Sequence, residues 1–147
     1  MESTFVMVKP NGVAGGLIGE IIGRYEKSRL AVSAIQIKHM TQDEAEGFYA
    51  EHKERPFFGE LVEFMTSGPT LLLVLKGENA VEAARTLNGA TNPADAAPGT
   101  IRYDFAPDMG KNIVHSSDSV ESAQREISYW FSESNSLISY PAHSSIA

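Results

Sequence analysis

His115 is the residue whose type and surroundings most favour chemistry in this sequence. It ends a predicted short strand, residues 112–115, and Ser116, Ser117 and Asp118 follow it just before a predicted helix. The start of a helix favours anions, because its first backbone N–H groups are unpaired and the helix dipole is positive there. Imidazole has a pKa near neutral pH and can act as a nucleophile. On this pattern alone, a purely structural histidine remains the commoner interpretation.

Arg85, Arg102 and Thr91 are the side chains best suited to hold a phosphate group. Guanidinium forks match phosphate oxygens, and a threonine hydroxyl can donate to them. On this pattern alone, an ordinary surface arginine is the commoner interpretation of each. Phe57 and Phe58 follow Arg55-Pro56. Two interpretations are equally consistent with this pair. Either one ring packs in the core and the other meets a ligand, or both rings pack in the core.

Several other kinds of site find no support. The chain has no cysteine, which excludes disulfides, thiolate catalysis and cysteine-based zinc sites. No histidine has another four residues away, so a histidine-based metal site is weakly supported. The glycines of residues 12–19 precede no Lys-Ser or Lys-Thr, and they lack G-x-G spacing. They therefore indicate a turn and a helix start rather than a P-loop or a dinucleotide-binding loop.

Apolar periodicity predicts the elements that must position these side chains. Strands are expected at residues 4–9, 31–38, 70–76 and 112–115, with 70–76 buried in the sheet centre. Helices are expected at about 17–28, 41–51, 80–87 and 120–131, with a further short apolar stripe at 58–65. The order βαββαβ predicts a mixed α/β (α+β), ferredoxin-like fold, in which helices cover a four-stranded antiparallel sheet.

Local signals refine these elements. The alternation of residues 31–38 changes phase at Ile35, which indicates a β-bulge. Thr41 with Glu44 is a capping-box pattern, and Asn79 is placed to cap the helix that Gly89 ends. Residues 90–111 contain Pro and Gly without a clear period, so we expect a long functional or disordered loop that carries Arg102.

Composition limits the class of protein. The 147 residues, 42% hydrophobic and 21% charged, predict one folded domain over 1–147 with a Ser-rich surface tail from 132. Twelve basic and 19 acidic residues give a net charge of −7, so non-specific nucleic-acid binding is not expected. No signal peptide is evident, and the longest apolar run, residues 71–75, is too short to span a membrane. We expect a cytoplasmic protein.

Six blocks of sequence resemble the nucleoside diphosphate kinase family. The most specific is residues 112–119, N-I-V-H-S-S-D-S, which matches that family's active-site signature N-x-x-H-[GA]-S-D. The other five occur in the family's order and at its spacing; they are residues 4–12, 55–58, 66–69, 89–93 and 97–102. The resemblance extends from about residue 4 to 131, most of the chain.

The resemblance implies a phosphotransferase that moves the γ-phosphate of a nucleoside triphosphate, typically ATP, to a nucleoside diphosphate. His115 would be the nucleophile of a ping-pong route through a phosphohistidine. Glu126 and Ser117 match residues that orient this histidine. The matches to phosphate- and sugar-binding positions are Lys9, Arg85, Thr91, Arg102 and Asn112.

The resemblance also implies the remaining ligands. Phe57 matches the position where the nucleobase stacks, with Leu61, Met109 and Tyr49 nearby in the pocket. Stacking accepts any base, so both ribo- and deoxynucleotides are expected. Mg²⁺ would arrive on the nucleotide phosphates, with Asp118 touching it through water. Family members form tetramers or hexamers built from dimers, so a homo-oligomer is expected.

Four features depart from the family pattern. Ser116 replaces a usual Gly or Ala after the histidine, Asn11 replaces an Asp, and Tyr103 replaces a Gly. The tail lacks the aromatic, acidic ending of many hexameric members. We expect Ser116 to tune the nucleophile modestly, so a Ser116→Gly variant should be less than about a hundredfold faster.

Three other functions compete with that of an active kinase. A catalytically weakened nucleotide-binding or regulatory family member would carry Ser116 as its defect. An RNA- or ligand-binding module of similar topology is disfavoured by the net charge and by the lack of an aromatic-basic RNA motif. A metal hydrolase is disfavoured because the sequence lacks the metal-ligating residues that such an enzyme needs. Phosphotransfer from ATP to a diphosphate distinguishes the first alternative from an active kinase.

Overall fold

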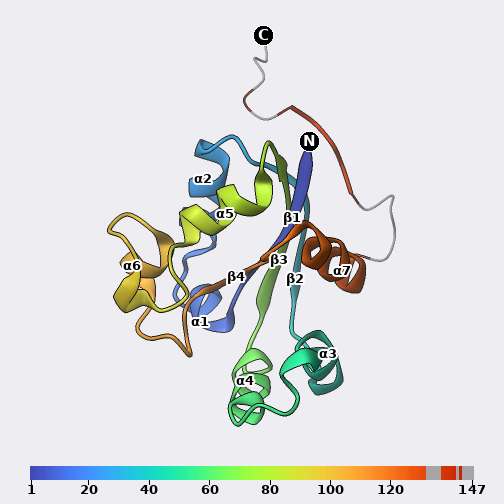
Figure 1. The fold of residues 1–147 in the computed structure, drawn as a ribbon, viewed down its shortest axis with the longest axis vertical. Coiled ribbons are helices and arrows are strands. Elements are labelled where there is room, and N and C mark those ends of the chain that lie inside the picture. Colours follow the sequence, from blue (N-terminus) through green and yellow to red (C-terminus); the bar gives the residue numbers. More distant parts are fainter. Residues whose placement is uncertain (132–136, 142, 144–147) are drawn as a thin grey trace.

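The computed structural model describes residues 1–131, 137–141 and 143. Its centre is a four-stranded sheet in the order β2-β3-β1-β4. The strands are β1 (Glu2–Val8), β2 (Ala31–Lys38), β3 (Thr70–Gly77) and β4 (Val114–Ser116), and every neighbouring pair is antiparallel. This is the predicted ferredoxin-like arrangement, with β3 and β1 in the middle (Figure 1).

Alternation along the strands divides the core between the two faces of the sheet. Val6 and Val8 pack on one face with α2 (Ile18–Lys27) and α5 (Ala80–Asn88). Phe5 and Met7 pack on the other face with α3 (Gln42–Phe48), α4 (Phe58–Met65) and α7 (Val120–Trp130). Because successive strand residues point to opposite faces, β1 supplies both cores at once.

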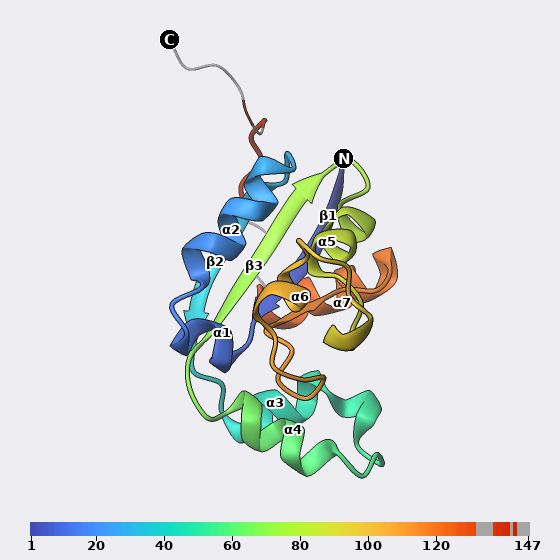
Figure 2. The ribbon, with the colours of Figure 1, turned by 90° about the vertical axis from the view of Figure 1, so that its left-hand side faces the viewer.

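The helices α3 and α4 stand together beyond one end of the sheet, and η1 (Ala50–His52) lies between them along the chain (Figure 2). The predicted capping box begins α3: the Thr41 hydroxyl accepts from the Glu44 N–H, and Glu44 accepts from the Thr41 N–H. The expected helix 41–51 therefore exists but is divided into α3 and η1.

The β-bulge of β2 is confirmed, since the register with β3 shifts between Val32 and Ala34. The prediction that the Asn79 side chain caps α5 is wrong. Asn79 occupies the N-cap position without a side-chain hydrogen bond, and Glu2 instead accepts from the Val81 N–H at 2.8 Å. The N-terminal strand thus caps α5, which local sequence could not indicate.

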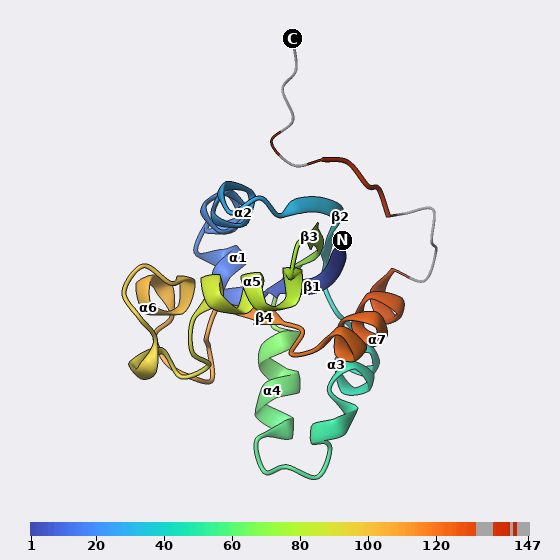
Figure 3. The ribbon, with the colours of Figure 1, turned by 45° about the horizontal axis from the view of Figure 1, so that its top comes forward.

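Three helical segments were not predicted. α1 (Pro10–Ala14) begins where a turn was expected, with Pro10 at its first position. The region 90–111, expected to be a loop, contains η2 (Pro93–Asp95) and α6 (Ile101–Phe105), and Thr100 caps α6. α6 and α7 lie on opposite sides of α5, with β4 between them (Figure 3).

The described part of the C-terminal tail lies along the edge strand β2. The Ile138 N–H donates to the Ser33 carbonyl at 2.8 Å, and the Val32 N–H donates to the Tyr140 hydroxyl at 3.0 Å. The rest of the tail predicted to be a surface segment, residues 132–136, 142 and 144–147, lies outside the described residues.

Candidate active site

His115 lies on β4, directly opposite Met7 of β1. Because opposite residues share a face of the sheet, its ring joins the core formed with α3 and α7. The Phe48 ring meets it edge-on at 5.4 Å between centroids, and the Tyr49 ring does so at 6.4 Å. The His115 side chain is 23% exposed, so one part of an otherwise enclosed imidazole reaches solvent.

Glu126 and Ser117 fix the orientation of this imidazole. The His115 Nε2 lies 3.0 Å from Glu126 Oε1, and the Ser117 hydroxyl donates to the same oxygen at 2.7 Å. Both partners are buried, and the Ser117 N–H also donates to the Phe5 carbonyl, which ties this segment to β1. A carboxylate only accepts, so this contact assigns the proton to Nε2, and Nδ1 keeps its lone pair with no hydrogen-bond partner among the described residues.

Lys9 and Asn112 form a buried pair at the end of β1. The Lys9 ammonium donates to Asn112 Oδ1 at 2.8 Å, and Asn112 Nδ2 donates to the Thr91 carbonyl at 3.1 Å. Burial, followed by the nearby charge of Arg102, lowers the pKa of Lys9 to about 8. The three segments that carry Lys9, Thr91 and Asn112 are therefore joined at one place.

Arg102 is held in place by two backbone carbonyls. Its guanidinium donates to Gly89 O at 2.7 Å and to Val114 O at 2.8 Å, and the residue is 8% exposed. Its Nε has no partner in the described part of the chain. Burial is the main cause that lowers the pKa of Arg102. The arginine expected in a loop is thus a buried, oriented cation on α6.

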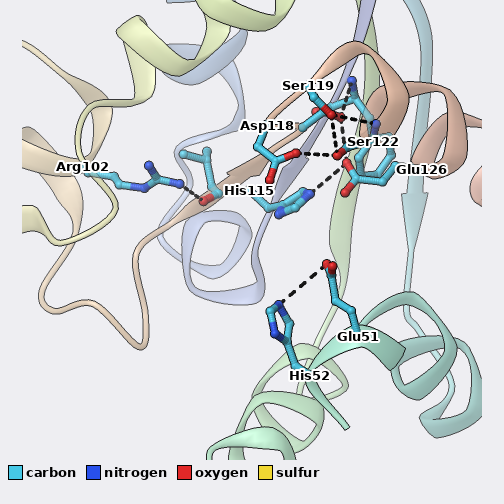
Figure 4. Close-up of polar contacts among 11 residues, drawn as sticks. Glu51, His52, Arg102, His115, Asp118, Ser119, Ser122 and Glu126 are labelled. Carbon is cyan, nitrogen blue, oxygen red and sulfur yellow. Dashed lines mark hydrogen bonds and ion pairs between the residues drawn. The ribbon is translucent and has the colours of Figure 1, made fainter. Parts of the chain in front are cut away.

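Asp118 lies at the start of the turn into α7. The Ser122 hydroxyl donates to its Oδ1, and the Ser119 side chain caps the helix by accepting from the Ser122 N–H at 3.0 Å. The hydrogen bond from Ser122 is the largest cause that lowers the pKa of Asp118, with smaller contributions from Ser119 and Arg85. Asp118 therefore presents a charged carboxylate beside His115 (Figure 4).

These side chains line one cavity of about 1090 Å³. The predicted site residues on its wall are Lys9, Arg85, Thr91, Arg102, Asn112, His115, Asp118 and Glu126. Ser117 lies behind the wall, fully buried. Ser116 is also on the wall, in β4 opposite Val6.

The residues expected around a nucleobase are not gathered on this wall. Phe57 is 47% exposed at the N-terminus of α4, and Met109 is 58% exposed. Leu61 packs against the core of α3, α4 and α7, as does Phe58. Of the two phenylalanines, one is therefore free to meet a ligand and one packs against the core. Tyr49 is buried behind His115, and burial, then the charge of Glu126, raises the pKa of its hydroxyl.

Glu51, His52 and Arg125 line the cavity and were not predicted. Figure 4 shows Glu51 and His52 across an open space from His115. The His52 ring lies 5.6 Å from the Phe57 ring, which links the cavity wall to the exposed aromatic residue. In the sequence, Glu51 and His52 could have been identified as site residues only from their position just before the block 55–58.

No group of three or more His, Cys, Asp or Glu side chains that could hold a metal occurs in 1–131, 137–141 and 143. Within the same residues, no helix combines the length and apolar character needed to cross a membrane.

Comparison with known proteins identifies close relatives. The family model described as "Nucleoside diphosphate kinase" matches residues 2–136. A protein of that name from Archaeoglobus fulgidus is 56% identical over 90% of this chain and 88% of its own length. Another from Macrococcus caseolyticus is 55% identical over 95% of this chain and 94% of its own.

Solved structures agree in fold over most of the chain. The nucleoside diphosphate kinase family protein from Babesia bovis superposes with a TM-score of 0.91 at 42% identity, covering 97% of this chain and 96% of that one. The nucleoside diphosphate kinase from Aquifex aeolicus gives a TM-score of 0.90 at 41% identity, covering 93% and 99%.

Proposed function

This chain belongs to the nucleoside diphosphate kinase family, and from that premise we propose how its own residues perform the reaction. The protein is a phosphotransferase that moves the γ-phosphate of a nucleoside triphosphate to a nucleoside diphosphate. The relatives carry the name of the active enzyme, and they give no support to a weakened regulatory protein.

We propose His115 as the nucleophile. The observation that carries this proposal is the 3.0 Å contact of its Nε2 with Glu126, which leaves the Nδ1 lone pair available on the wall of the cavity that Lys9, Arg85 and Arg102 also line. Nδ1 attacks the γ-phosphorus, and the bond from phosphorus to the β–γ bridging oxygen breaks. The electron pair leaves on the nucleoside diphosphate, and phosphohistidine remains.

The second half reaction reverses these bonds on a different diphosphate. A terminal oxygen of the acceptor attacks the phosphorus, and the N–P bond returns its electron pair to Nδ1. Throughout, the Nε2 proton stays toward Glu126, which stabilises positive charge on the ring. Because the phosphoryl group waits on the protein, one cavity serves donor and acceptor in turn.

Lys9, Arg102 and Arg85 provide the positive charge for this transfer. The transition state is loose and places its charge on the equatorial oxygens, so catalysis depends on positioning and electrostatics. Arg102 has its fork fixed by two carbonyls, and Lys9 is fixed by Asn112. Cations that are already oriented need little reorganisation when charge develops. Thr91 joins them on the wall as a hydroxyl donor.

A divalent cation is required by kinases of this family, and we propose Mg²⁺. Asp118 is ionised, lies beside His115 and belongs to no cluster of three metal-binding side chains in the described residues. That donor set fits Mg²⁺, which keeps several waters and is held by one or two carboxylates and substrate phosphates. Asp118 would hold it through water; when bound, the ion neutralises phosphate charge.

We propose that the nucleobase stacks on Phe57, with Leu61 and Met109 beside it. Support comes from the exposure of the Phe57 ring and from its place beside His52, which lines the cavity. A stacked base with few contacts to its edges is weakly discriminated, so ribo- and deoxynucleotides of every base are expected as substrates. Tyr49 acts behind the histidine as a neutral aromatic support.

The remaining proposals concern the whole chain. We propose one domain over residues 1–147, since the described helices all pack on one sheet. We also propose a homo-oligomer, tetrameric or hexameric, in the cytoplasm. Ile35 and Ile37 support the assembly, because they are 55% and 63% exposed on the edge strand β2.

Initial-rate kinetics with ATP and a second diphosphate test this function. A route through phosphohistidine gives parallel double-reciprocal lines, and His115→Gln should abolish turnover while nucleotide binding persists. Intersecting lines would mean that both nucleotides must be bound together, which contradicts the proposal. An active His115→Gln variant would do the same.

A further inference from the structure

Tyr25 and Asn88 form a buried polar pair in an otherwise apolar core. Both residues are 0% exposed, and the Tyr25 hydroxyl donates to Asn88 Oδ1 at 2.5 Å. Tyr25 lies on α2 and Asn88 is the last residue of α5, so the bond joins two helices that cover the same face of the sheet. A buried polar group is costly unless it is hydrogen-bonded, so each partner depends on the other.

This pair is one residue from the carbonyl that holds Arg102. Asn88 is followed by Gly89, whose carbonyl accepts from the Arg102 guanidinium at 2.7 Å. Gly89 leaves no room for a side chain, because its φ is +86° and a Cβ placed there would lie 2.5 Å from the Thr100 hydroxyl oxygen, so the backbone here packs directly on Thr100. Thr100 in turn caps α6, the helix that carries Arg102.

Electrostatics agree with this connection. Burial is the largest influence on the Tyr25 hydroxyl and raises its pKa, while the Arg102 charge acts in the opposite sense. The Tyr25 side chain is therefore within electrostatic range of the guanidinium as well as bonded to the residue before Gly89. None of the steps proposed above uses either residue of the pair.

We propose that the Tyr25–Asn88 hydrogen bond positions Arg102, by fixing the end of α5 so that the Gly89 carbonyl holds the guanidinium toward the transferred phosphoryl group. This inference rests on the proposed role of Arg102 in phosphate binding. Tyr25 and Asn88 are positioning residues, since neither lines the cavity in the described residues. Small displacements of a phosphate-binding cation are expected to slow transfer strongly.

The test is the rate at which His115 is phosphorylated in a single turnover at saturating ATP. Tyr25→Phe keeps the ring and removes the hydroxyl, and it should slow this step about fivefold or more. Asn88→Leu removes the other partner and should give a similar loss, which keeps the test available if one variant folds poorly. Tyr140→Phe is the matched control, because it removes a tyrosine hydroxyl that accepts a hydrogen bond at the sheet edge.

The Arg102→Lys background separates positioning from general stability. If Tyr25 acts through Arg102, then Tyr25→Phe should cost less than about twofold in the rate once the guanidinium is gone, because coupled residues are non-additive. The same loss in both backgrounds would overturn the inference. A lower melting temperature with an unchanged rate in Tyr25→Phe would also overturn it.

The Arg102→Lys single variant tests the premise that Arg102 binds the transferred phosphate. A loss of about tenfold or more in its rate supports the phosphate role of Arg102. An unchanged rate would remove that role and the inference with it. A slow Arg102→Lys variant combined with a fully active Tyr25→Phe variant would overturn only the inference.

Discussion

Glu126 Oε1 accepts hydrogen bonds from His115 and Ser117, and this shared acceptor determines which ring nitrogen of the histidine is free. His115 is the proposed nucleophile in this arrangement, Glu126 is its hydrogen-bond partner, and Ser117 orients Glu126. His115 lies on β4 and Glu126 on α7, and Ser117 belongs to the short turn 117–119 that joins these two elements. The carboxylate therefore orients the ring, with its Nε2 toward Glu126.

Replacing Glu126 by Gln should slow phosphorylation of His115 about tenfold or more. The amide keeps the shape but removes the negative charge that stabilises the ring when it becomes positive. Rapid-quench measurement of phosphohistidine formation checks this. Glu121→Gln, on the exposed side of the same helix, is the matched control and should be unaffected. Equal rates for the two variants would remove Glu126 from the mechanism.

Lys9 gives the site a predicted pH dependence. Burial and Arg102 lower its pKa from 10.5 to about 8, so above pH 8 the folded protein loses a positive charge that phosphate binding uses. The affinity for ADP should therefore fall as the pH rises above about 8. Titration calorimetry from pH 7 to 9.5 measures it. Lys9→Met should bind weakly and lack this dependence; a variant that retains it would assign the change to another group.

The effect of Lys9 on stability changes with pH in the opposite direction to its effect on ADP affinity. Between about pH 8 and 10.5 the unfolded chain retains the Lys9 proton and the folded chain does not. Because the unfolded state then binds more protons, the contribution of Lys9 to the free energy of unfolding increases with pH across this window. The penalty for burying the charged form is present below pH 8 and is relieved above it.

Sequence alone identified the reactive residues only as candidates. Without the family motif, an ordinary structural or surface role is the commoner interpretation of His115, Arg85 and Arg102. The burial of Arg102 depends on carbonyls of Gly89 and Val114, which are remote in sequence and meet only in the fold. Glu51 and His52 were missed for the same reason, since only the packing of η1 brings them to the cavity.

At the scale of elements, strong local sequence signals were sufficient to predict a helix or strand, and weak signals were not. The capping box at Thr41 and the uninterrupted apolar strand β3 were predicted correctly. The helix α6 was missed because its stability is tertiary: Arg24 on α2 pairs with Asp104 at 2.8 Å and donates to the Gly99 carbonyl at 3.0 Å. α1 was missed because Gly12 suggests a turn, whereas it lies in a helix where a Cβ would be 2.6 Å from Val8 Cγ1.

Thr41→Ala should destabilise the protein by about 1 kcal/mol, because the Glu44 N–H loses its acceptor. The melting temperature should fall by about 3 °C. Differential scanning calorimetry measures this, and Thr41→Ser, which keeps the hydroxyl, should stay within about 0.5 kcal/mol of the parent. A Thr41→Ala variant as stable as the parent would show that packing alone holds the start of α3.

At the scale of the whole molecule, β2 leaves an open edge. Ile35 and Ile37 pair with Leu73 and Leu71 and therefore share their face, yet both isoleucines are largely exposed. The described tail residues form hydrogen bonds with the first part of this strand, at Val32 and Ser33. An apolar, unpaired edge is a template for another chain, which supports the proposed assembly.

Ile37→Lys should therefore produce a smaller assembly, because it places a charge on that apolar edge. Light scattering after size-exclusion chromatography measures the mass. Gln36→Lys adds the same charge on the opposite face of the strand and should leave the assembly unchanged. An Ile37→Lys protein with the parental mass would direct the search for the interface to another surface.

The most direct test of the account is the intact mass of the protein after incubation with Mg-ATP. We predict a gain of one phosphoryl group that is acid-labile, absent in His115→Ala and discharged by any nucleoside diphosphate. A protein that binds nucleotide yet gains no mass, or that gains the same mass in His115→Ala, would contradict the central claim that His115 carries the phosphoryl group.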